Sequence, residues 1–201
     1  MTLRAIFFDL GGVIVRTEYQ ASRERLAERL NMTYEDISKI VFEAETSRKA
    51  SLGEISVKEH WLAVTRKLRL PVAEAESIRT EFFAGDVIDR DLLDFIRSLR
   101  PRYRTGVISN AWGDLRDYVV KHQFDDAFDT LIISAEIGMM KPQPEVYQLA
   151  LKQAQVEANE AAFIDDTPRN VEAANALGMH GIVFRDPAQV KENLKALLSQ
   201  R

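Results

Sequence analysis

Five short, uninterrupted apolar segments constrain the fold of this chain more than any other feature of its sequence. They cover residues 4–9, 105–110, 130–136, 161–166 and 180–186. Apolar runs of this length, without alternation of polar residues, are typical of strands that are covered on both faces. The segments therefore predict a parallel sheet buried between two layers of helices.

Amphipathic helical patterns separate these segments. In residues 90–100 the apolar side chains fall on one stripe, as in a helix that packs on a sheet. Pro144 and Pro168 suit the first turn of a helix, and Gly178 suits a helix end. The other patterns cover residues 115–123, 144–155, 168–178 and 188–200. Strands that alternate with helices predict an α/β fold with a Rossmann-like parallel sheet.

Residues 16–88 interrupt this rhythm, because they contain four amphipathic helical patterns and no segment typical of a buried strand. The patterns cover residues 19–31, 33–50, 56–70 and 72–85. We therefore predict a small all-helical domain at 16–88, inserted after the first strand. Residues 1–15 and 89–201 are expected to form the core domain. The aromatic residues on the helical stripes of the insert are expected to be buried there: Phe42, Trp61, Phe82 and Phe83.

The composition narrows the partners of such a chain. A net charge of −4 provides no broad positive surface for nucleic acid or an anionic membrane, and no apolar run has the length of a membrane span. The absence of cysteine excludes disulfides and thiolate chemistry, and it is compatible with a reducing compartment. No basic leader precedes the first strand, so we expect no signal peptide and a cytoplasmic protein. The three histidines form no His-x-x-x-His pair, which argues against a histidine zinc site. Monomer and homodimer both stay open.

Polar side chains follow four of the predicted strands. Asp9 ends the first, and Ser109 with Asn110 ends the second. Lys141 follows the third within the string GMMKPQP, and the pair Asp165–Asp166 ends the fourth. In an open parallel sheet, ligands bind beyond the carboxyl ends of the strands, where the strand order reverses. These residues are therefore expected to converge on one site.

Their chemistry suits a phosphate ester and a metal ion. Carboxylates without cysteine or histidine favour a hard cation such as Mg²⁺. A serine, backbone N–H groups and a lysine can hold phosphate oxygens, and an aspartate can act as a nucleophile.

Each residue also has a plain structural interpretation. Asp9 suits a turn, Ser109 and Asn110 suit helix N-caps, and Lys141 could be an ordinary solvated lysine. The occurrence of all four groups at equivalent positions favours the chemical interpretation. Adjacent Asp165 and Asp166 favour it further, because two carboxylates repel each other unless a cation lies nearby.

Four strings, in this order, resemble the motifs of the haloacid dehalogenase-like hydrolase superfamily, subfamily IA: FFDLGGVI, VISN, GMMKPQPEVYQLAL and FIDDTPRNVEAANALGM. The resemblance covers the whole chain, and the helical insert stands where this superfamily carries a compact cap. The last two strings are long and therefore specific. The resemblance implies a Mg²⁺-dependent phosphatase that forms an aspartyl-phosphate on a small phosphorylated metabolite.

The resemblance also implies roles for single residues. Asp9 would be the catalytic nucleophile, and Lys141 would neutralise charge on the nucleophile and on the phosphoryl group. Ser109 and Asn110 would bind the substrate together with Lys141. The implied metal ligands are Asp9, the backbone carbonyl of Gly11, Asp166 and Asp165, the last through water or by orienting other groups.

Within the superfamily, the chain is similar to the group that contains bacterial sugar-1-phosphate phosphatases and the phosphatase-like N-terminal domain of soluble epoxide hydrolases. The strings DLGGVI and SLGEISVKEHW carry this similarity. Most phosphatases of the superfamily have an Asp two residues after the nucleophile, as general acid and base, but this chain has Gly11 there. We therefore expect a slow enzyme, or one that prefers good leaving groups such as the anomeric oxygen of a sugar 1-phosphate.

Other residues have weaker assignments. Glu18 is a candidate for the missing proton donor, and Arg16 either contacts the substrate or forms a surface pair. Glu54 and Ile55, in the turn LGEIS, are candidates to face the substrate. Asn170 either supports the site or is an ordinary polar residue of a first helical turn.

Two other functions compete with the phosphatase. A metal-independent haloacid dehalogenase would use Asp9 as a nucleophile on carbon, but it would gain nothing from the pair Asp165–Asp166. A non-catalytic protein that binds a phosphate ligand would explain Gly11, but it would not need Asp9 and Lys141. A phosphomutase is a further alternative that normally relies on the missing acid and base.

Overall fold

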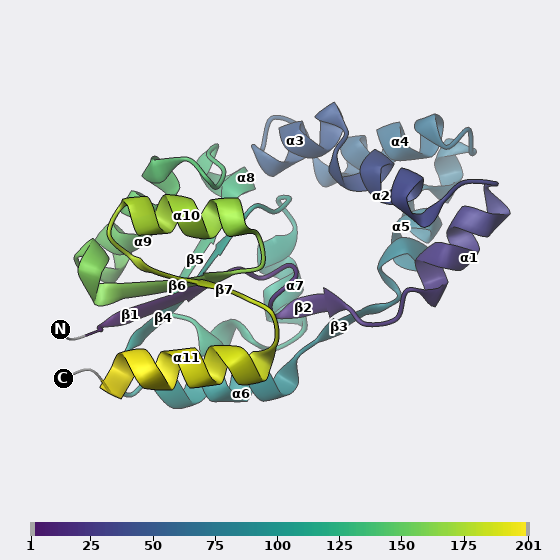
Figure 1. Ribbon diagram of the computed structural model, residues 1–201. Coiled ribbons are helices and arrows are strands. Elements are labelled where there is room, and N and C mark those ends of the chain that lie inside the picture. Colours follow the sequence, from purple (N-terminus) through teal and green to yellow (C-terminus); the bar gives the residue numbers. More distant parts are fainter. Residues whose placement is uncertain (1–2, 200–201) are drawn as a thin grey trace.

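The computed structural model describes residues 3–199, and it confirms the α/β fold with a Rossmann-like parallel sheet. The outermost residues of the predicted core domain, and residue 200 of the last predicted helix, lie outside the described range. Five parallel strands form the sheet in the order β5-β4-β1-β6-β7 (Figure 1). Their bounds are β1 Ala5–Phe8, β4 Arg104–Ser109, β5 Thr130–Ile133, β6 Ala161–Asp165 and β7 His180–Val183.

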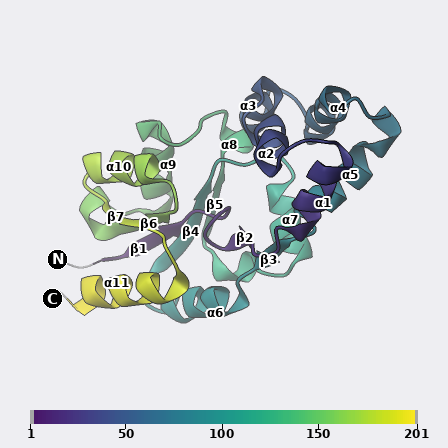
Figure 2. The same ribbon diagram turned by 45° about the vertical axis from the view of Figure 1, so that its right-hand side comes forward.

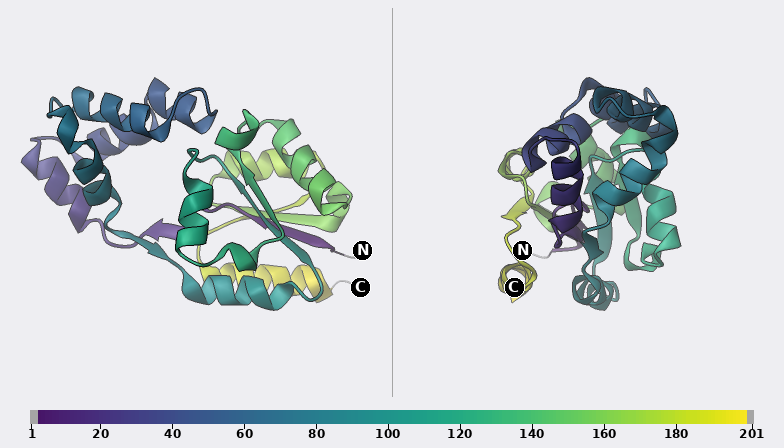
Figure 3. Two further views of the ribbon diagram at one scale, coloured as in Figure 1. Left: turned by 180° about the vertical axis from the view of Figure 1, so that it is seen from behind. Right: turned by 90° about the vertical axis from the view of Figure 1, so that its right-hand side faces the viewer.

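Helices cover both faces of this sheet, as the continuous apolar strands require. Alternate residues of a strand point to opposite faces. In β1, Ile6 and Phe8 pack toward α6 (Arg90–Leu99) and α11 (Pro187–Ser199), while Phe7 packs toward α9 (Pro144–Ala154). The helix α7 (Leu115–Lys121) lies on the first face and α10 (Pro168–Ala176) on the second (Figure 3). Every β1 side chain is therefore buried, and β1 lies in the middle of the sheet.

A separate bundle of helices follows β1 and lies beyond the carboxyl end of the sheet (Figure 1). We refer to residues 18–85 as the cap. Its elements are α1 Ala21–Arg29, α2 Tyr34–Phe42, α3 Glu45–Ser51, α4 Val57–Lys67, the 3-10 helix η1 Val72–Glu74 and α5 Ala75–Phe83. Its own apolar core includes Leu26, Ile37, Trp61 and Phe82. The all-helical character of the cap is confirmed.

The number of cap helices differs from the prediction. The expected single helix over 33–50 is two helices, because Ala44 takes an extended backbone with ψ of 151° between α2 and α3. The start of α2 is set by a capping box in which Thr33 and Asp36 exchange hydrogen bonds. The helical pattern continues through the break, so periodicity alone did not reveal it.

A two-stranded antiparallel ribbon joins the cap to the core, and the sequence did not predict it. It pairs β2 (Val15–Thr17) with β3 (Asp86–Ile88), so both chain crossings lie side by side (Figure 2). Strands of three residues, none of which is fully buried, carry little hydrophobic pattern. The proposed domain boundaries at 16 and 88 fall within this ribbon, and they stay a prediction.

The strand predicted over 130–136 is also too long. The strand β5 ends at Ile133, and a short helix α8 (Ser134–Ile137) follows. The Ser134 hydroxyl contacts the loop after β4, where it accepts from Ala111 N–H at 2.9 Å and donates to Ala111 C=O at 3.1 Å. The helix thereby anchors the loop that follows Ser109.

Within residues 3–199, no helix combines the length and the apolar character needed to cross a lipid bilayer.

Candidate active site

The predicted site residues meet at the carboxyl edge of the sheet. Asp9 follows β1, Ser109 ends β4 and Asp165 ends β6, and these strands are neighbours. From β1 the chain passes to β4 and β5 on one side and then returns to β6 on the other side. The strand order therefore reverses between β1 and β6, where α/β folds bind their ligands.

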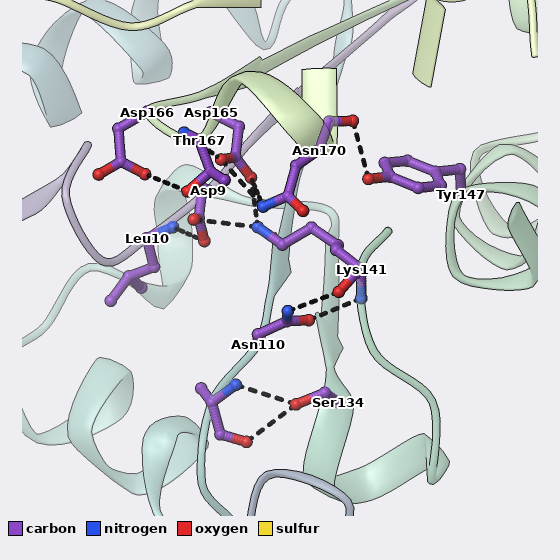
Figure 4. Close-up of polar contacts among 11 residues, drawn as sticks. Asp9, Leu10, Asn110, Ser134, Lys141, Tyr147, Asp165, Asp166, Thr167 and Asn170 are labelled. Atoms are coloured by element: carbon purple, nitrogen blue, oxygen red, sulfur yellow. Dashed lines mark hydrogen bonds and ion pairs between the residues drawn. The ribbon is translucent and has the colours of Figure 1, made fainter. Parts of the chain in front are cut away.

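A buried ion cluster occupies this crevice (Figure 4). Lys141 Nζ lies 3.0 Å from Asp9 Oδ2 and 2.6 Å from Asp165 Oδ2. All three side chains are almost inaccessible to solvent. Asp9 Oδ1 accepts a hydrogen bond from the Leu10 N–H at 2.7 Å, so both oxygens of this carboxylate are oriented. Such an arrangement presents one carboxylate oxygen next to a fixed positive charge.

Asp165 has the fullest set of partners in the cluster. Its Oδ1 accepts from the Thr167 N–H at 2.8 Å, and the Asn170 Nδ2 lies 3.1 Å from each of its oxygens. The Asn170 carbonyl in turn accepts from the Tyr147 hydroxyl at 2.9 Å. These contacts place Asn170 in support of the site, and they suit Asp165 to hold Lys141 in position.

Asn110 contacts the backbone of Lys141 rather than its ammonium group. Its Nδ2 donates to the Lys141 carbonyl at 2.9 Å, and its Oδ1 accepts from the Lys141 N–H at 2.7 Å. Both ends of the amide are therefore engaged, and they tie the loop after β4 to the loop that carries Lys141. The predicted contact of Asn110 with substrate stays a prediction, as does that of Ser109, which is buried at the end of β4.

Three carboxylates at the site could hold a metal ion. One oxygen from each of Asp9, Asp165 and Asp166 lies within 4.8 Å of the others, and Asp166 is accessible to solvent. A donor set made only of oxygen suits a hard cation such as Mg²⁺. The sequence brings these groups together because β1 and β6 pair in register up to Phe8 and Ile164.

Gly12 makes room for Asp166. Its φ is +77°, and a Cβ built there would lie 2.1 Å from Asp166 Oδ2. Gly11 is different, because a Cβ built at Gly11 meets no atom within 4 Å. The structure therefore requires glycine at position 12, whereas it leaves room for a side chain at position 11.

We expect Gly12→Ala to destabilise the protein, while Gly11→Ala does not. Alanine at a positive φ costs about 1–2 kcal/mol, and its Cβ also displaces Asp166. The melting temperature should fall by about 2–8 °C. Thermal melts of both variants check this, and equal melting temperatures would contradict the assigned role of Gly12.

The site gathers three carboxylates around a single lysine, so one positive charge faces three acidic groups. Burial raises the pKa of Asp9 to about 6, Lys141 works against this rise, and the charge of Asp165 adds to it. Burial also raises the pKa of Asp166, and Asp165 again adds to the rise. A bound cation would relieve both effects.

Arg16 and Glu18, the weaker candidates, form an ion network at the base of the cap. Arg16 Nε lies 2.9 Å from Glu18 Oε1, and Arg16 Nη2 lies 2.8 Å from Asp89 Oδ2. The Arg16 guanidinium also covers the ring of Phe184. Glu18 is therefore held by Arg16, and its role as proton donor stays a prediction.

The turn that contains Glu54 lies against the core. A Cβ at Gly53 would meet the carbonyl oxygen of Ala135 in α8 at 2.2 Å, so the cap turn packs directly on the core backbone. This places Glu54 and Ile55 at the cap–core junction. Whether their side chains contact a substrate stays a prediction.

Trp112 is the residue at this junction that the sequence did not single out. It belongs to the loop after β4, yet its ring packs among aromatic rings of the cap, 4.7 Å from His60 and 5.9 Å from Trp61 between centroids. A large aromatic residue in a polar loop, three positions after a strand-end serine, was the available signal. The predicted burial of the cap aromatics holds for Trp61 and Phe82, but Phe83 is only half-buried and Phe42 is 47% exposed.

A comparison with known families decides the assignment. The family of haloacid dehalogenase-like hydrolases matches residues 3–178 of the chain. The chain belongs to the haloacid dehalogenase-like hydrolases.

Relatives of this hydrolase include phosphatases of similar length. A D-ribitol-5-phosphate phosphatase of Bacteroides thetaiotaomicron is 24% identical over 98% of this chain and 99% of its own. A sesquiterpene phosphatase of Aspergillus oryzae is 27% identical over 98% of this chain and 97% of its own. The hydrolase also matches bifunctional epoxide hydrolase 2 of rat, mouse and pig, but it covers only 22%, 39% and 37% of those proteins.

A solved structure shows the same fold. The crystal structure of a haloacid dehalogenase family enzyme from Bacteroides thetaiotaomicron, in complex with magnesium and inorganic phosphate, superposes with a TM-score of 0.78. The two chains are 22% identical, and the match covers 94% of this hydrolase and 98% of that enzyme. This likeness shows that the sheet and cap of the hydrolase share an architecture with that enzyme.

Proposed function

We propose that this hydrolase is a Mg²⁺-dependent phosphatase that acts on a small phosphorylated metabolite through an aspartyl-phosphate. The observation that carries this proposal is the position of Asp9, buried at the end of β1 with Lys141 Nζ at 3.0 Å and Asp166 beside it. A carboxylate oriented between a lysine and a second acidic group is suited to attack phosphorus. The same surroundings suit the neutralisation of charge on a phosphoryl group.

The proposed reaction has two displacement steps. An oxygen of Asp9 forms a bond to phosphorus while the bond from phosphorus to the ester oxygen breaks, and the leaving oxygen takes up a proton. Water then attacks phosphorus and loses a proton, the bond to Asp9 breaks, and inorganic phosphate leaves. Lys141 stabilises negative charge in both steps, and Asp165 with Asn170 keeps Lys141 in place. Ser109 is expected to contact the phosphate from the end of β4.

The residues present fit a magnesium ion. Asp9 and Asp166 would hold it together with the backbone carbonyl of Gly11, and Asp165 would act through water or through Lys141. Gly12 supports the placement of Asp166, because the missing Cβ lets Asp166 Oδ2 lie against the backbone there. Bound Mg²⁺ would supply positive charge to the phosphate oxygens and hold the phosphate in line with Asp9.

Gly11 favours substrates that need little help from an acid. Without a side chain at this position, the leaving oxygen depends on its own acidity or on another donor. A sugar phosphate with an anomeric leaving group, such as a sugar 1-phosphate, meets this condition. The names of the D-ribitol-5-phosphate phosphatase and of a phosphorylated carbohydrates phosphatase of Thermotoga maritima, which is 24% identical over 90% of this chain, support a phosphorylated carbohydrate.

The two rival functions account for less of the site. A metal-independent dehalogenase would leave the solvent-accessible Asp166, and the room that Gly12 makes for it, without a purpose. A non-catalytic binder would not require a carboxylate buried at the end of β1 with Lys141 Nζ at 3.0 Å.

A panel of phosphorylated metabolites, with and without Mg²⁺, tests the proposed function. We expect release of inorganic phosphate in the presence of Mg²⁺. EDTA should reduce it at least about 100-fold, because Mg²⁺ would neutralise charge on the phosphoryl group in both steps. Excess Mg²⁺ should restore it fully. Halide release from 2-haloacids that survives EDTA would instead establish the dehalogenase. Tight binding of beryllofluoride or phosphate without turnover of any phosphoester, including acetyl phosphate, would establish the binder.

A further inference from the structure

Three aromatic side chains from separate parts of the chain form a small surface at the cap–core junction. We refer to Phe42, Phe83 and Trp112 as the aromatic wall. Between ring centroids, Trp112 lies 6.2 Å from Phe42, nearly parallel at 24°, and 6.1 Å from Phe83. Phe42 ends α2 and Phe83 ends α5, whereas Trp112 comes from the core. The wall therefore exists only because the core loop meets the cap.

One side of the wall is covered and another is open. Behind it, His60 and Trp61 are fully buried in the cap, and their rings contact Trp112. In front, Phe42 is 47% exposed, and Phe83 and Trp112 are half-buried. Clustered aromatic rings that stay accessible to water provide a surface for an apolar partner.

Trp112 ties the wall to the loop that carries Ser109. Trp112 follows Ser109 by three residues, so the chain between them spans at most about 11 Å. This loop is fixed at two points, by the bonds of Asn110 to the Lys141 backbone and of Ala111 to Ser134. In an in-line displacement the leaving oxygen points away from the attacking oxygen. Asp9 follows β1 directly, and the cap lies beyond this carboxyl end of the sheet (Figure 1).

Two arginines of the cap near the wall, Arg23 and Arg79, already have partners. Arg23, which lies 4.1 Å from the ring centroid of Phe82, pairs with Asp86 at 2.9 Å and donates to the Phe82 carbonyl at 2.9 Å. Arg79 of α5 pairs with Asp114, two residues beyond Trp112. The wall therefore presents an apolar surface to a neutral group rather than a site for a second anion.

We propose that Trp112 is a specificity-determining residue that selects phosphate esters whose leaving group presents an apolar face next to the phosphate. A sugar ring offers such a face through its C–H groups, and a hydrocarbon chain offers one along its length. An acyclic polyol and a very small leaving group offer none. This inference rests on the proposed phosphatase function and names the feature by which that site chooses its substrate.

The test compares selectivity in Trp112→Ala with that of the wild-type enzyme. The substrates are glucose 1-phosphate, geranyl phosphate and acetyl phosphate, all with Mg²⁺. We expect kcat/KM for the preferred ester to fall about 10- to 50-fold, while kcat/KM for acetyl phosphate stays within about twofold, because only the former contacts the ring. Trp112→Phe should lie between the two. Trp61→Phe, which changes a buried ring of the same cluster, should leave the selectivity ratio unchanged.

The three substrates distinguish the possible leaving groups. A loss confined to glucose 1-phosphate supports a sugar ring on the wall, and a loss confined to geranyl phosphate supports a hydrocarbon. Equal losses on all three substrates, or no loss on any, would overturn the role of Trp112 while leaving the phosphatase intact. Failure of the wild-type enzyme to hydrolyse even acetyl phosphate would overturn the proposed function and this inference together.

Fluorescence provides a readout independent of turnover. The chain has two tryptophans, so Trp112 is the sole tryptophan in the Trp61→Phe variant and its emission can be excited selectively. In that variant without Mg²⁺, the preferred ester at saturating concentration should shift or quench the emission, whereas inorganic phosphate should not. An unchanged emission at saturation would count against contact with the wall, even if Trp112→Ala failed to fold.

Discussion

Asp9→Asn is expected to reduce phosphate release by about 10⁴-fold or more on every substrate, because the amide cannot form the proposed aspartyl-phosphate. The remaining groups, Lys141 among them, would still bind the ester. The loss should therefore fall on kcat rather than on KM. Steady-state release of inorganic phosphate, together with phosphorylation of Asp9 in a rapid quench of the wild-type enzyme, measures this.

The same substitution should preserve the fold and raise the stability of the metal-free protein at neutral pH. Burial raises the pKa of Asp9 to about 6, above its ordinary value of 3.8, so the folded state binds this proton more tightly than the unfolded state. The contribution of Asp9 to stability is therefore greatest below about pH 4, and it declines as the pH rises to about 6. Asparagine carries no charge and avoids this decline, so the variant should melt higher than the wild type at pH 7 in EDTA, with a smaller difference at pH 4.5.

A matched control keeps this result interpretable. Asp117→Asn changes an exposed carboxylate of α7 that lies outside the ion cluster, and it should alter neither turnover nor the pH dependence of melting. Activity of Asp9→Asn within tenfold of the wild type would exclude Asp9 as the nucleophile. Loss of the folded state would leave turnover of the variant without meaning, and trapping of phosphorylated Asp9 in the wild type would then decide the question.

Gly11→Asp is expected to increase turnover of alcohol phosphates by about 10²- to 10⁴-fold, the range in which a positioned general acid and base contributes. The structure permits this change, because a Cβ at Gly11 meets no atom within 4 Å and the backbone φ there is not positive. Gly11 also lies two residues from Asp9, at the edge of the sheet that carries the site. Comparison of kcat across esters with leaving groups of different pKa measures the effect.

The leaving-group dependence is the sharper readout for this variant. In the wild type, kcat should fall steeply as the pKa of the leaving group rises, because no side chain at position 11 donates a proton. In Gly11→Asp the slope should flatten, and acetyl phosphate should gain least. Gly11→Asn has nearly the same shape without the acid, so it should keep the steep slope. A flat dependence in the wild type would show that another group, such as Glu18, already supplies the proton.

Much of the fold could be predicted because buried strands carry their own signal. Residues 161–166 are apolar up to a pair of carboxylates, and only a central strand with helices on both faces satisfies such a run. The convergence of Asp9 with Asp165 follows from the same logic, since parallel neighbours end at the same edge. Two local features were missed because their residues show no clear pattern of buried and exposed positions along the chain. The ribbon of β2 and β3 and the break at Ala44 depend on pairing and packing with other segments.

By itself, the sequence determined the fold class, the helical cap and the residue types gathered at the carboxyl edge, because burial periodicity and strand-end chemistry are local properties of the chain. Only the tertiary structure decided which contacts each of those residues makes. In it, Asn110 hydrogen-bonds the Lys141 backbone, and Asp165 accepts hydrogen bonds from several donors. It required Gly12 for Asp166 while leaving Gly11 unconstrained, and it carried Trp112 into the cap. These outcomes depend on distances between segments far apart in the chain, and such distances are set only when the sheet, the loops and the cap pack together.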